Sequence, residues 1–232
     1  MNLRKRNYNK ELLDSDNIPL EDIKKNMREL GIINTWLGGH KITVAAAKKI
    51  NANKKEITIC EIGCGGGDNL AAIAKALSKD VSIKFIGIDI KQECIDFAKQ
   101  DPNNSYIVEW ITSDYRNVSF TKKPDIIFSS LFCHHFTEDI LKEQLIWMKE
   151  NSTIGFFIND LHRHLFAYYS IKLTTSIFSN SYLVKNDASL SVARGFKKIE
   201  WKNILFAAGI NNYTIQWKWA FRHLILYMHE RK

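Results

Sequence analysis

Prolines are scarce in this chain of 232 residues, and no apolar run approaches the length that crosses a bilayer. The three prolines lie far apart, at positions 19, 102 and 124, so no proline-rich linker marks a domain boundary. No signal peptide is visible at the start of the sequence. We therefore expect one domain with elaborations, without secretion or integral membrane insertion.

Cysteines are also few, and their spacing excludes the common zinc motifs. The four cysteines, at positions 60, 64, 94 and 133, form no CxxC pair, and no histidine stands at ligand spacing from the first two. Cys60 and Cys94 fall on apolar faces of predicted elements and are expected to be reduced core residues, as is usual in the cytoplasm. We therefore expect a cytoplasmic protein without a bound metal.

Acidic residues are outnumbered, which gives a formal net charge of +8. Such a charge can favour nucleic acid, an anionic membrane surface or an anionic ligand, but a lysine-rich surface without a specific partner is the simpler interpretation. The sequence contains no dense stripe of lysine and arginine interleaved with aromatic residues. Nucleic-acid binding is therefore not expected.

Helical patterns precede the first strand. A helix is predicted to begin after Pro19, with Gly31 as its C-cap. Gly38 and Gly39 interrupt the pattern before a second helix. Because this part precedes the sheet, we expect residues 1–50 to form a helical N-terminal lid.

From residue 56 onward, short apolar runs alternate with helical patterns. Such runs are typical of strands that are buried on both faces of a parallel sheet. The alternation implies right-handed βαβ units and a doubly wound α/β fold. Strands are predicted at residues 57–62, 82–88, 106–111, 125–130 and 153–158. Helices are predicted between them at residues 68–77, 91–99 and 137–149.

The segment 161–198 departs from this rhythm, because polar residues interrupt its aromatic and β-branched residues. We interpret it as a helical insertion over the carboxyl edge of the sheet, on the substrate side of a domain that spans residues 51–232. A helix over 197–208 and an antiparallel pair of strands, 213–219 and 221–228, would close the fold. The turn between these strands lacks the usual Asn-Gly signal.

The most informative stretch joins the first strand to its helix and reads Glu61-Ile62-Gly63-Cys64-Gly65-Gly66-Gly67-Asp68. Gly63, Gly65 and Gly67 allow the backbone to bend sharply and to approach a ligand without Cβ clashes. The helix N-terminus adds free N–H groups and positive potential. On its own the pattern is weakly specific, and a tight turn without a ligand is the alternative.

Acids at the ends of the next two strands give this loop a context. Asp89 closes the second strand, where a carboxylate can accept both ribose hydroxyls of an adenosine. Asp114 follows the third strand, where a carboxylate can accept the exocyclic amine of adenine. Glu61 and Asp68 bracket the glycines, so a pyrophosphate would be repelled, whereas an amino group and a sulfonium would be attracted. This pairing disfavours a nicotinamide oxidoreductase.

Together these features resemble the class I S-adenosylmethionine-dependent methyltransferases over the stretch from Glu61 to Ile158. The glycine loop resembles their first motif, Asp89 their ribose-binding acid and Ser113-Asp114 their adenine motif. The resemblance implies a seven-stranded, mostly parallel sheet of order 3-2-1-4-5-7-6 with the last strand antiparallel. It implies S-adenosyl-L-methionine as cofactor and S-adenosyl-L-homocysteine as product. Further cofactor contacts are expected from Ile90, Tyr115 and Ser130.

After the fourth strand the sequence reads Ser129-Ser130-Leu131-Phe132-Cys133-His134-His135-Phe136. Nucleobase amine methyltransferases have a Pro-Pro-aromatic loop at the place that this stretch resembles, and its absence argues against base flipping. The LxxHH form instead resembles the branch that methylates small molecules, including quinones and phenols. Either histidine could deprotonate a phenol, with His135 as the catalytic candidate and His134 as a substrate contact. Helix capping or packing against adenine is the alternative role.

The fifth strand is followed by Asn159-Asp160-Leu161-His162-Arg163-His164. His162 is a second candidate base, and Arg163 could hold an anionic oxygen of the acceptor, unless the loop is only a solvated surface. Arg194, in the insertion, could line the acceptor pocket or serve as a structural ion-pair partner.

Trp36 and His40 flank the glycine pair near the N-terminus. In the family that the sequence resembles, the segment before the first strand often folds over the cofactor. Both residues are therefore candidates for substrate binding, and the alternative for Trp36 is to anchor its helix to the core.

We predict methyl transfer from S-adenosylmethionine to a small lipophilic acceptor, with the oxygen of a phenol or quinol as the favoured methylated atom. The reaction is a direct displacement that depends on the alignment of donor and acceptor. An RNA or protein methyltransferase and a cofactor-binding regulatory module without transfer activity are the alternatives. A narrow apolar pocket would favour the small acceptor, and an open basic groove would favour RNA. We expect a monomer or homodimer.

Overall fold

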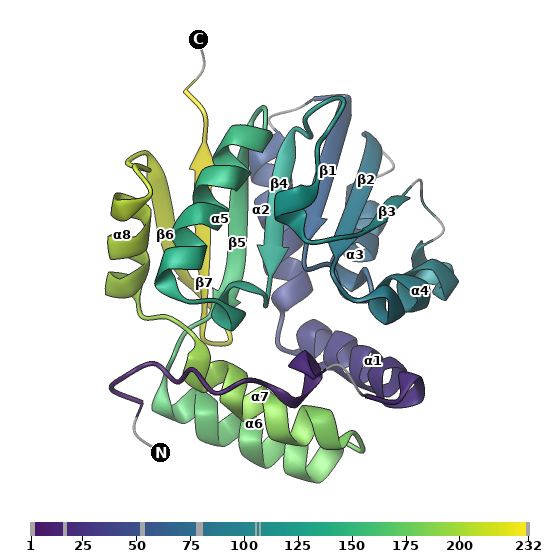
Figure 1. The fold of residues 1–232 in the computed structure, drawn as a ribbon, viewed down its shortest axis with the longest axis vertical. Helices are drawn as coiled ribbons and strands as arrows, with labels where there is room; N and C mark the ends of the chain where they lie inside the picture. Colours follow the sequence, from purple (N-terminus) through teal and green to yellow (C-terminus); the bar gives the residue numbers. More distant parts are fainter. Residues whose placement is uncertain are drawn as a thin grey trace.

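The computed structural model describes residues 3–15, 18–51, 54–77, 81–104, 106 and 108–230. A seven-stranded sheet forms its centre, with the order β3-β2-β1-β4-β5-β7-β6 that the resemblance predicted (Figure 1). Neighbouring strands from β3 to β5 pair in parallel, and β7 runs antiparallel to both β5 and β6. The strands are β1 Glu56–Ile62, β2 Ser82–Asp89, β3 Val108–Thr112, β4 Ile126–Ser130, β5 Gly155–Leu161, β6 Tyr213–Lys218 and β7 Arg222–Met228. The start of the predicted third strand includes residue 107, which lies outside the described residues.

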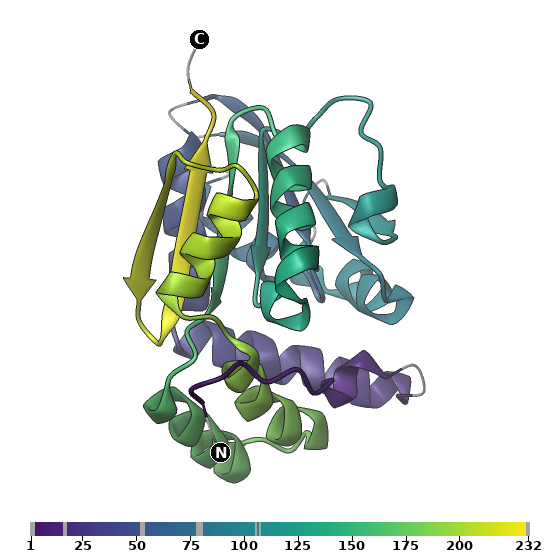
Figure 2. The same cartoon turned by 60° about the vertical axis from the view of Figure 1, so that its left-hand side comes forward.

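Apolar side chains alternate between the two faces of the strands, so the core has two halves. On one face, Cys60 and Ile62 of β1 pack with the helices α5 and α8. On the other, Ile57 and Ile59 pack with α2 and α3. Figures 1 and 2 show these helices on opposite faces of the sheet. The helices that flank the sheet are α2 Gly39–Asn51, α3 Asp68–Leu77, α4 Gln92–Gln100, α5 Glu138–Asn151 and α8 Lys198–Ala207.

The first helix differs from its predicted form. Helix α1 covers Leu20–Trp36 and continues through Gly31 instead of ending there. A Cβ at Gly31 would lie 3.9 Å from the Asp68 side chain, so the glycine brings α1 close to the start of α3. The left-handed residue that follows the helix is Gly38, with φ +75°. Helix α2 packs in the core, so within the predicted lid only the part before it lies over the edge of the sheet.

The predicted insertion consists of two helices, α6 Leu165–Phe178 and α7 Tyr182–Arg194. They lie at the carboxyl end of the parallel strands, beside α1 and the N-terminal segment (Figures 1 and 2). The large apolar side chains of α6 point mostly outward: Leu165, Phe166, Tyr169, Leu173, Ile177 and Phe178 are all exposed. The aromatic character of the insertion, which motivated a lipophilic acceptor, therefore belongs largely to its outer surface. None of the helices in the described ranges combines the length and hydropathy that a bilayer crossing requires.

Candidate functional site

The glycine loop between β1 and α3 has the backbone conformation that its sequence predicts. Gly63, Gly65 and Gly67 have φ angles of +65°, +50° and +78°, which glycine adopts without the strain of a Cβ. At Gly63 there is a packing reason as well, because a Cβ would lie 2.2 Å from the Phe132 ring. At Gly65 the nearest atom is the Met27 sulfur, 3.4 Å from the position of a Cβ. Gly65 is therefore the glycine of this loop whose backbone is least constrained by core packing.

Asp89 ends β2 directly beside this loop. One carboxylate oxygen accepts the Gly65 N–H at 2.9 Å, and the other accepts the Lys91 N–H at 2.9 Å. Burial raises the pKa of Asp89, and these two N–H groups oppose the rise. Each oxygen keeps a second lone pair, which is what two ribose hydroxyls would need. The next residue, Ile90, is 69% exposed and offers an apolar surface at the same place.

Glu61 is fully buried at the end of β1, on the face covered by α2 and α3. Its Oε1 accepts a hydrogen bond from Asn69 at 3.1 Å, whereas Oε2 has no partner among the described residues. Burial raises the pKa of Glu61 well above its usual range, and the negative charge of Asp68 raises it further. A buried carboxylate oxygen without a partner is costly, and a cationic group beside it would offset that cost. The residues of this loop therefore fit a ligand that carries positive charge.

Asp68 connects the glycine loop to the helices that precede the sheet. Its Oδ2 lies 2.6 Å from His40 Nε2 and accepts a hydrogen bond from Asn34 at 3.2 Å. Burial alone would raise the pKa of Asp68, but the contacts with His40 and Asn34 outweigh it and lower the pKa. His40 thus contacts the predicted cofactor loop. Its substrate contact stays a prediction.

The predicted adenine motif lies after β3. Arg116 donates from its backbone N–H and its guanidinium to the Asp114 carboxylate, and lowers the pKa of Asp114. Ser113 donates its hydroxyl to the Asp114 carbonyl at 3.0 Å. Tyr115 is 6% exposed, and its ring packs on Trp147 in the core. Its hydroxyl has no partner among the described residues, and its cofactor contact stays a prediction.

Ser130 ends β4 on the same face of the sheet as Glu61. It is buried, and its hydroxyl lies 3.5 Å from the Asn159 side-chain nitrogen. Asn159 also donates to the Gly39 carbonyl at the start of α2, at 3.2 Å. Ser130 therefore lies at the carboxyl edge of the sheet, where its cofactor contact stays a prediction.

The histidine loop after β4 contains the short helix η4, Cys133–His135. His134 is 2% exposed, with its Nδ1 at 2.8 Å from Asp160 Oδ1 and its Nε2 at 3.5 Å from Glu11 Oε1. Burial alone would lower the pKa of His134, but Asp160 and Glu11 raise it to about 9. The two carboxylates therefore favour the protonated form of His134, and its burial contradicts the predicted contact with a substrate.

His135 has a different environment. Its Nδ1 lies 3.2 Å from Asp14 Oδ1 and its Nε2 lies 3.8 Å from Glu11 Oε2, while its side chain remains 21% exposed. Glu11 precedes the short helix η1, Leu12–Asp14, and Asp14 is its last residue, so both acids lie far from the histidines in sequence. Sequence reasoning missed both acids, because no local pattern links them to a loop beyond the fourth strand.

His162 lies in a separate group of rings. Its neighbours are His164, Phe221 and His223, with ring centroids 4.6 Å apart for His162 and His223. Burial and the charge of His164 lower its pKa, and its Nδ1 is buried without a partner. Within the described part of the chain, His162 makes no contact with His135, so the structure does not bring the two candidate bases together.

The two arginines that sequence reasoning assigned to the substrate have structural partners instead. Arg163 is 1% exposed and donates to the Gly195 carbonyl at 2.6 Å and to Glu200 at 3.1 Å. Arg194 is 4% exposed and donates to the carbonyls of His134 and His135 at 3.1 and 2.8 Å. These contacts contradict the predicted substrate contacts, because both guanidinium groups are buried against protein acceptors.

Trp36 ends α1 and is 74% exposed, so it does not anchor that helix to the core. The exposed indole leaves its contact with a substrate as a prediction.

Comparison with known proteins agrees with this geometry. Residues 59–151 match the family model described as a methyltransferase domain. No curated protein sequence matches the chain.

Several solved structures share the fold at low sequence identity. The plantazolicin methyltransferase BpumL in complex with SAH has 18% identity and a TM-score of 0.65, over 91% of this chain and 90% of that chain. Magnesium protoporphyrin IX methyltransferase from Synechocystis PCC 6803 with bound SAH has 15% identity and a TM-score of 0.58, over 93% and 90%. Human N-acetylserotonin methyltransferase in complex with SAM has 13% identity and a TM-score of 0.64, over 90% and 56%.

At these identities the solved structures establish the fold, and the match over residues 59–151 is to a methyltransferase domain. Strand order, loop conformation and the acid that ends β2 all agree with that match. The chain therefore has the fold of class I S-adenosylmethionine-dependent methyltransferases, and residues 59–151 match a methyltransferase domain.

Proposed function

We propose that this methyltransferase acts on a small lipophilic acceptor, and that it methylates the hydroxyl oxygen of a phenol or quinol. The observation that carries the proposal is the roof over the carboxyl edge of the sheet, formed by the N-terminal segment, α1, α6 and α7 (Figure 2). Because these elements cover the carboxyl edge of the sheet, a small acceptor suits this edge better than an RNA helix, which would need an open basic surface.

Hydrogen bonds fasten the parts of the roof to one another. Glu29 of α1 accepts the Asn180 N–H at 3.1 Å, in the turn between α6 and α7. Asp187 of α7 accepts the Leu12 and Leu13 N–H groups at 2.9 and 3.0 Å, which fixes the N-terminal segment. Arg6 extends this segment to the histidine loop, where it donates to the His134 carbonyl at 2.8 Å.

The solved structures give this size argument independent support. The similar enzymes are named for plantazolicin, magnesium protoporphyrin IX and N-acetylserotonin. Each is far smaller than a folded RNA or protein. We therefore assign the same size class to the acceptor of this enzyme.

When bound, S-adenosylmethionine supplies the methyl group on its sulfonium sulfur. Asp89 would hold the ribose hydroxyls, and Glu61 with Asp68 would place negative charge near the cationic end. His135 is the better placed of the two candidate bases, because Asp14 holds its Nδ1, whereas the Nδ1 of His162 has no partner among the described residues. Asp14 at its Nδ1 would orient the imidazole so that Nε2 takes the hydroxyl proton of the acceptor.

The test is a screen of phenols and quinols for release of S-adenosylhomocysteine by the purified protein. We expect turnover with at least one of them, and a loss of roughly 10²–10⁴-fold in kcat for His135→Ala if the imidazole is the base. His162→Ala is the matched control and should keep most of the activity. Methylation of RNA or protein in place of every small acceptor would overturn the proposal, and loss of activity in His162→Ala alone would reassign the base.

A further inference from the structure

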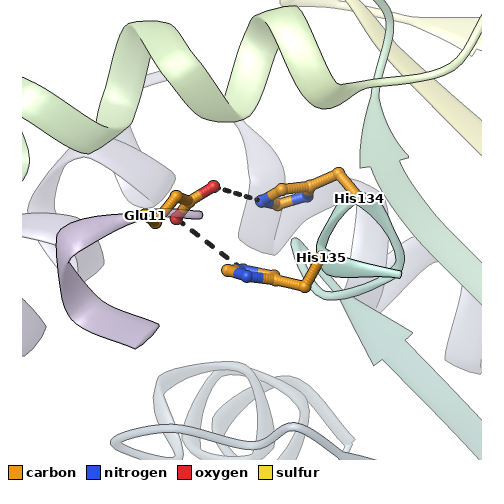
Figure 3. Close-up of side chains that lie close together, drawn as sticks. All are labelled: Glu11, His134 and His135. Carbon is orange, nitrogen blue, oxygen red and sulfur yellow. Dashed lines mark ion pairs between the residues drawn. The ribbon is translucent and has the colours of Figure 1, made fainter. Parts of the chain in front are cut away.

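A second chemical feature of the histidine loop is a group of ligand atoms that converge on one point. Glu11, His134 and His135 each offer one such atom, and these atoms all lie within 4.8 Å of one another. Figure 3 shows the imidazoles of His134 and His135 pointing from their loop toward the carboxylate of Glu11, which belongs to the N-terminal segment. The two Nε2 atoms lie 3.5 and 3.8 Å from the two oxygens of Glu11.

The opposite nitrogen of each imidazole is also held. His134 Nδ1 lies 2.8 Å from an Asp160 oxygen, and His135 Nδ1 lies 3.2 Å from an Asp14 oxygen. In metal sites a ligating histidine almost always donates its other N–H to a carboxylate or carbonyl, which fixes the ring and its tautomer. Here two separate aspartates orient two neighbouring rings so that both Nε2 atoms face one glutamate.

The charged side chains around these three residues also favour a bound cation. Among the described residues, Arg194 lies 4.0 Å from Glu11 and 3.5 Å from Asp14, and the buried Arg222 interacts electrostatically with Asp160. A third arginine of this region, Arg6, pairs with Glu138. The Glu11 carboxylate lies between the two Nε2 atoms, so a cation bound there would be attracted to its negative charge.

We infer that Glu11, His134 and His135 form a binding site for a divalent transition metal of the zinc type. Two imidazole nitrogens and one carboxylate are the donor set of catalytic zinc sites, which keep a fourth position open. Ligand atoms around tetrahedral zinc lie about 3.3 Å apart, so the observed separations need only small side-chain shifts. The open position would be on the side where His135 is partly exposed. The site uses no cysteine, so the cysteine spacing has no bearing on it.

One consequence rests on the proposed function. With the metal bound, His135 is a ligand and no longer a free proton acceptor. The cation would then stabilise the ionised hydroxyl of the acceptor at its fourth position. The site itself stands on the geometry of Glu11 and the two histidines.

The test is metal binding by the full-length protein after treatment with a chelator. Titration with zinc chloride, followed by calorimetry and elemental analysis after dialysis, should give one equivalent per chain. Cobalt(II) in place of zinc should give the visible absorption of a four-coordinate site. Glu11→Gln and His135→Ala should each weaken zinc binding by more than 100-fold, and Asp14→Asn by roughly 10–100-fold through the orientation of His135.

The matched control is His164→Ala, which removes an exposed histidine outside the group and should bind zinc as the unaltered protein does. Binding of S-adenosylhomocysteine by each variant reports that the fold is intact. No stoichiometric zinc binding, or equal binding by Glu11→Gln and His135→Ala, would overturn the inference. If zinc does not bind while S-adenosylhomocysteine does, the metal site is wrong and the methyltransferase function is untouched.

Discussion

The two halves of the site are held together in different ways. On the cofactor side, Asp89 is fixed by backbone N–H groups, and its partner Gly65 is only 24 residues away in sequence. On the acceptor side, the histidine loop is fixed by side chains from distant elements. Arg6 reaches Glu138 across 132 residues, and Arg194 reaches Asp14 across 180. The cofactor side is therefore a property of a local motif, whereas the acceptor side exists only once the whole chain has folded.

The largest effect is expected on the stability of the fold, from substitution of Arg163, whose contacts are structural. Replacing it by alanine removes a buried guanidinium from Glu200 and from a main-chain carbonyl, and should lower the free energy of unfolding by about 3–5 kcal/mol. Urea denaturation measures this loss. The affinity for S-adenosylhomocysteine should be unchanged. A large fall in affinity at unchanged stability would show that Arg163 contributes to ligand binding.

The next effect concerns the pH dependence of stability on the acceptor side. The folded pKa of His134 is raised from 6.5 to about 9, so the folded state holds its proton more tightly than the unfolded chain does. The resulting stabilisation is fully present below pH 6.5 and is lost as the pH rises through about 9. It amounts to about 3 kcal/mol at most.

Urea denaturation of chelator-treated protein between pH 6.5 and 9.5 measures that loss. His134→Gln should flatten the profile. A native profile as flat as that of the variant would show that His134 is neutral in the folded protein.

On the cofactor side, the two predicted adenosine acids should differ. Asp89→Ala should weaken S-adenosylhomocysteine binding by roughly 30-fold, about 2 kcal/mol, because charged hydrogen bonds to the ribose are lost. Asp114→Ala should have a smaller effect, since that carboxylate already pairs with Arg116. Isothermal calorimetry measures both affinities. Equal losses would mean that Asp114 leaves its arginine to bind adenine.

The smallest effect separates backbone strain from ligand contact. Gly65 and Gly209 both have positive φ, +50° and +66°, and a Cβ at Gly209 meets nothing within 4 Å. Alanine at either position should therefore lower stability by about 1–2 kcal/mol. Only Gly65→Ala should also weaken binding of S-adenosylhomocysteine. If both variants bind it equally well, the glycine loop does not approach the cofactor.

Much of the fold could be predicted because its signals are local. Apolar runs bounded by glycine and polar residues located the strands, and α3 begins and ends at the predicted residues, Asp68 and Leu77. The end of α1 could not be predicted, because Gly31 and Gly38 give the same sequence signal and only Gly38 has the left-handed conformation that follows the helix.

In the candidate site, too, the features set by local sequence could be predicted and those set by tertiary contacts could not. The conformation of the glycine loop and the position of Asp89 follow from residues next to strand ends. The partners of Arg163, Arg194 and His134 could not be predicted, because they come from other elements that reach the loop only through tertiary packing. An arginine near a sheet edge has the same sequence signal whether it binds substrate or a buried glutamate.

The central claim is that the glycine loop and its acids receive a positively charged nucleoside and not a dinucleotide phosphate. Calorimetric titration of the same protein sample with S-adenosylmethionine, S-adenosylhomocysteine and NADH tests it most directly. The account predicts one equivalent of each adenosyl compound, loss of that binding in Asp89→Ala, and no binding of NADH. Saturable NADH binding without binding of either adenosyl compound would contradict it.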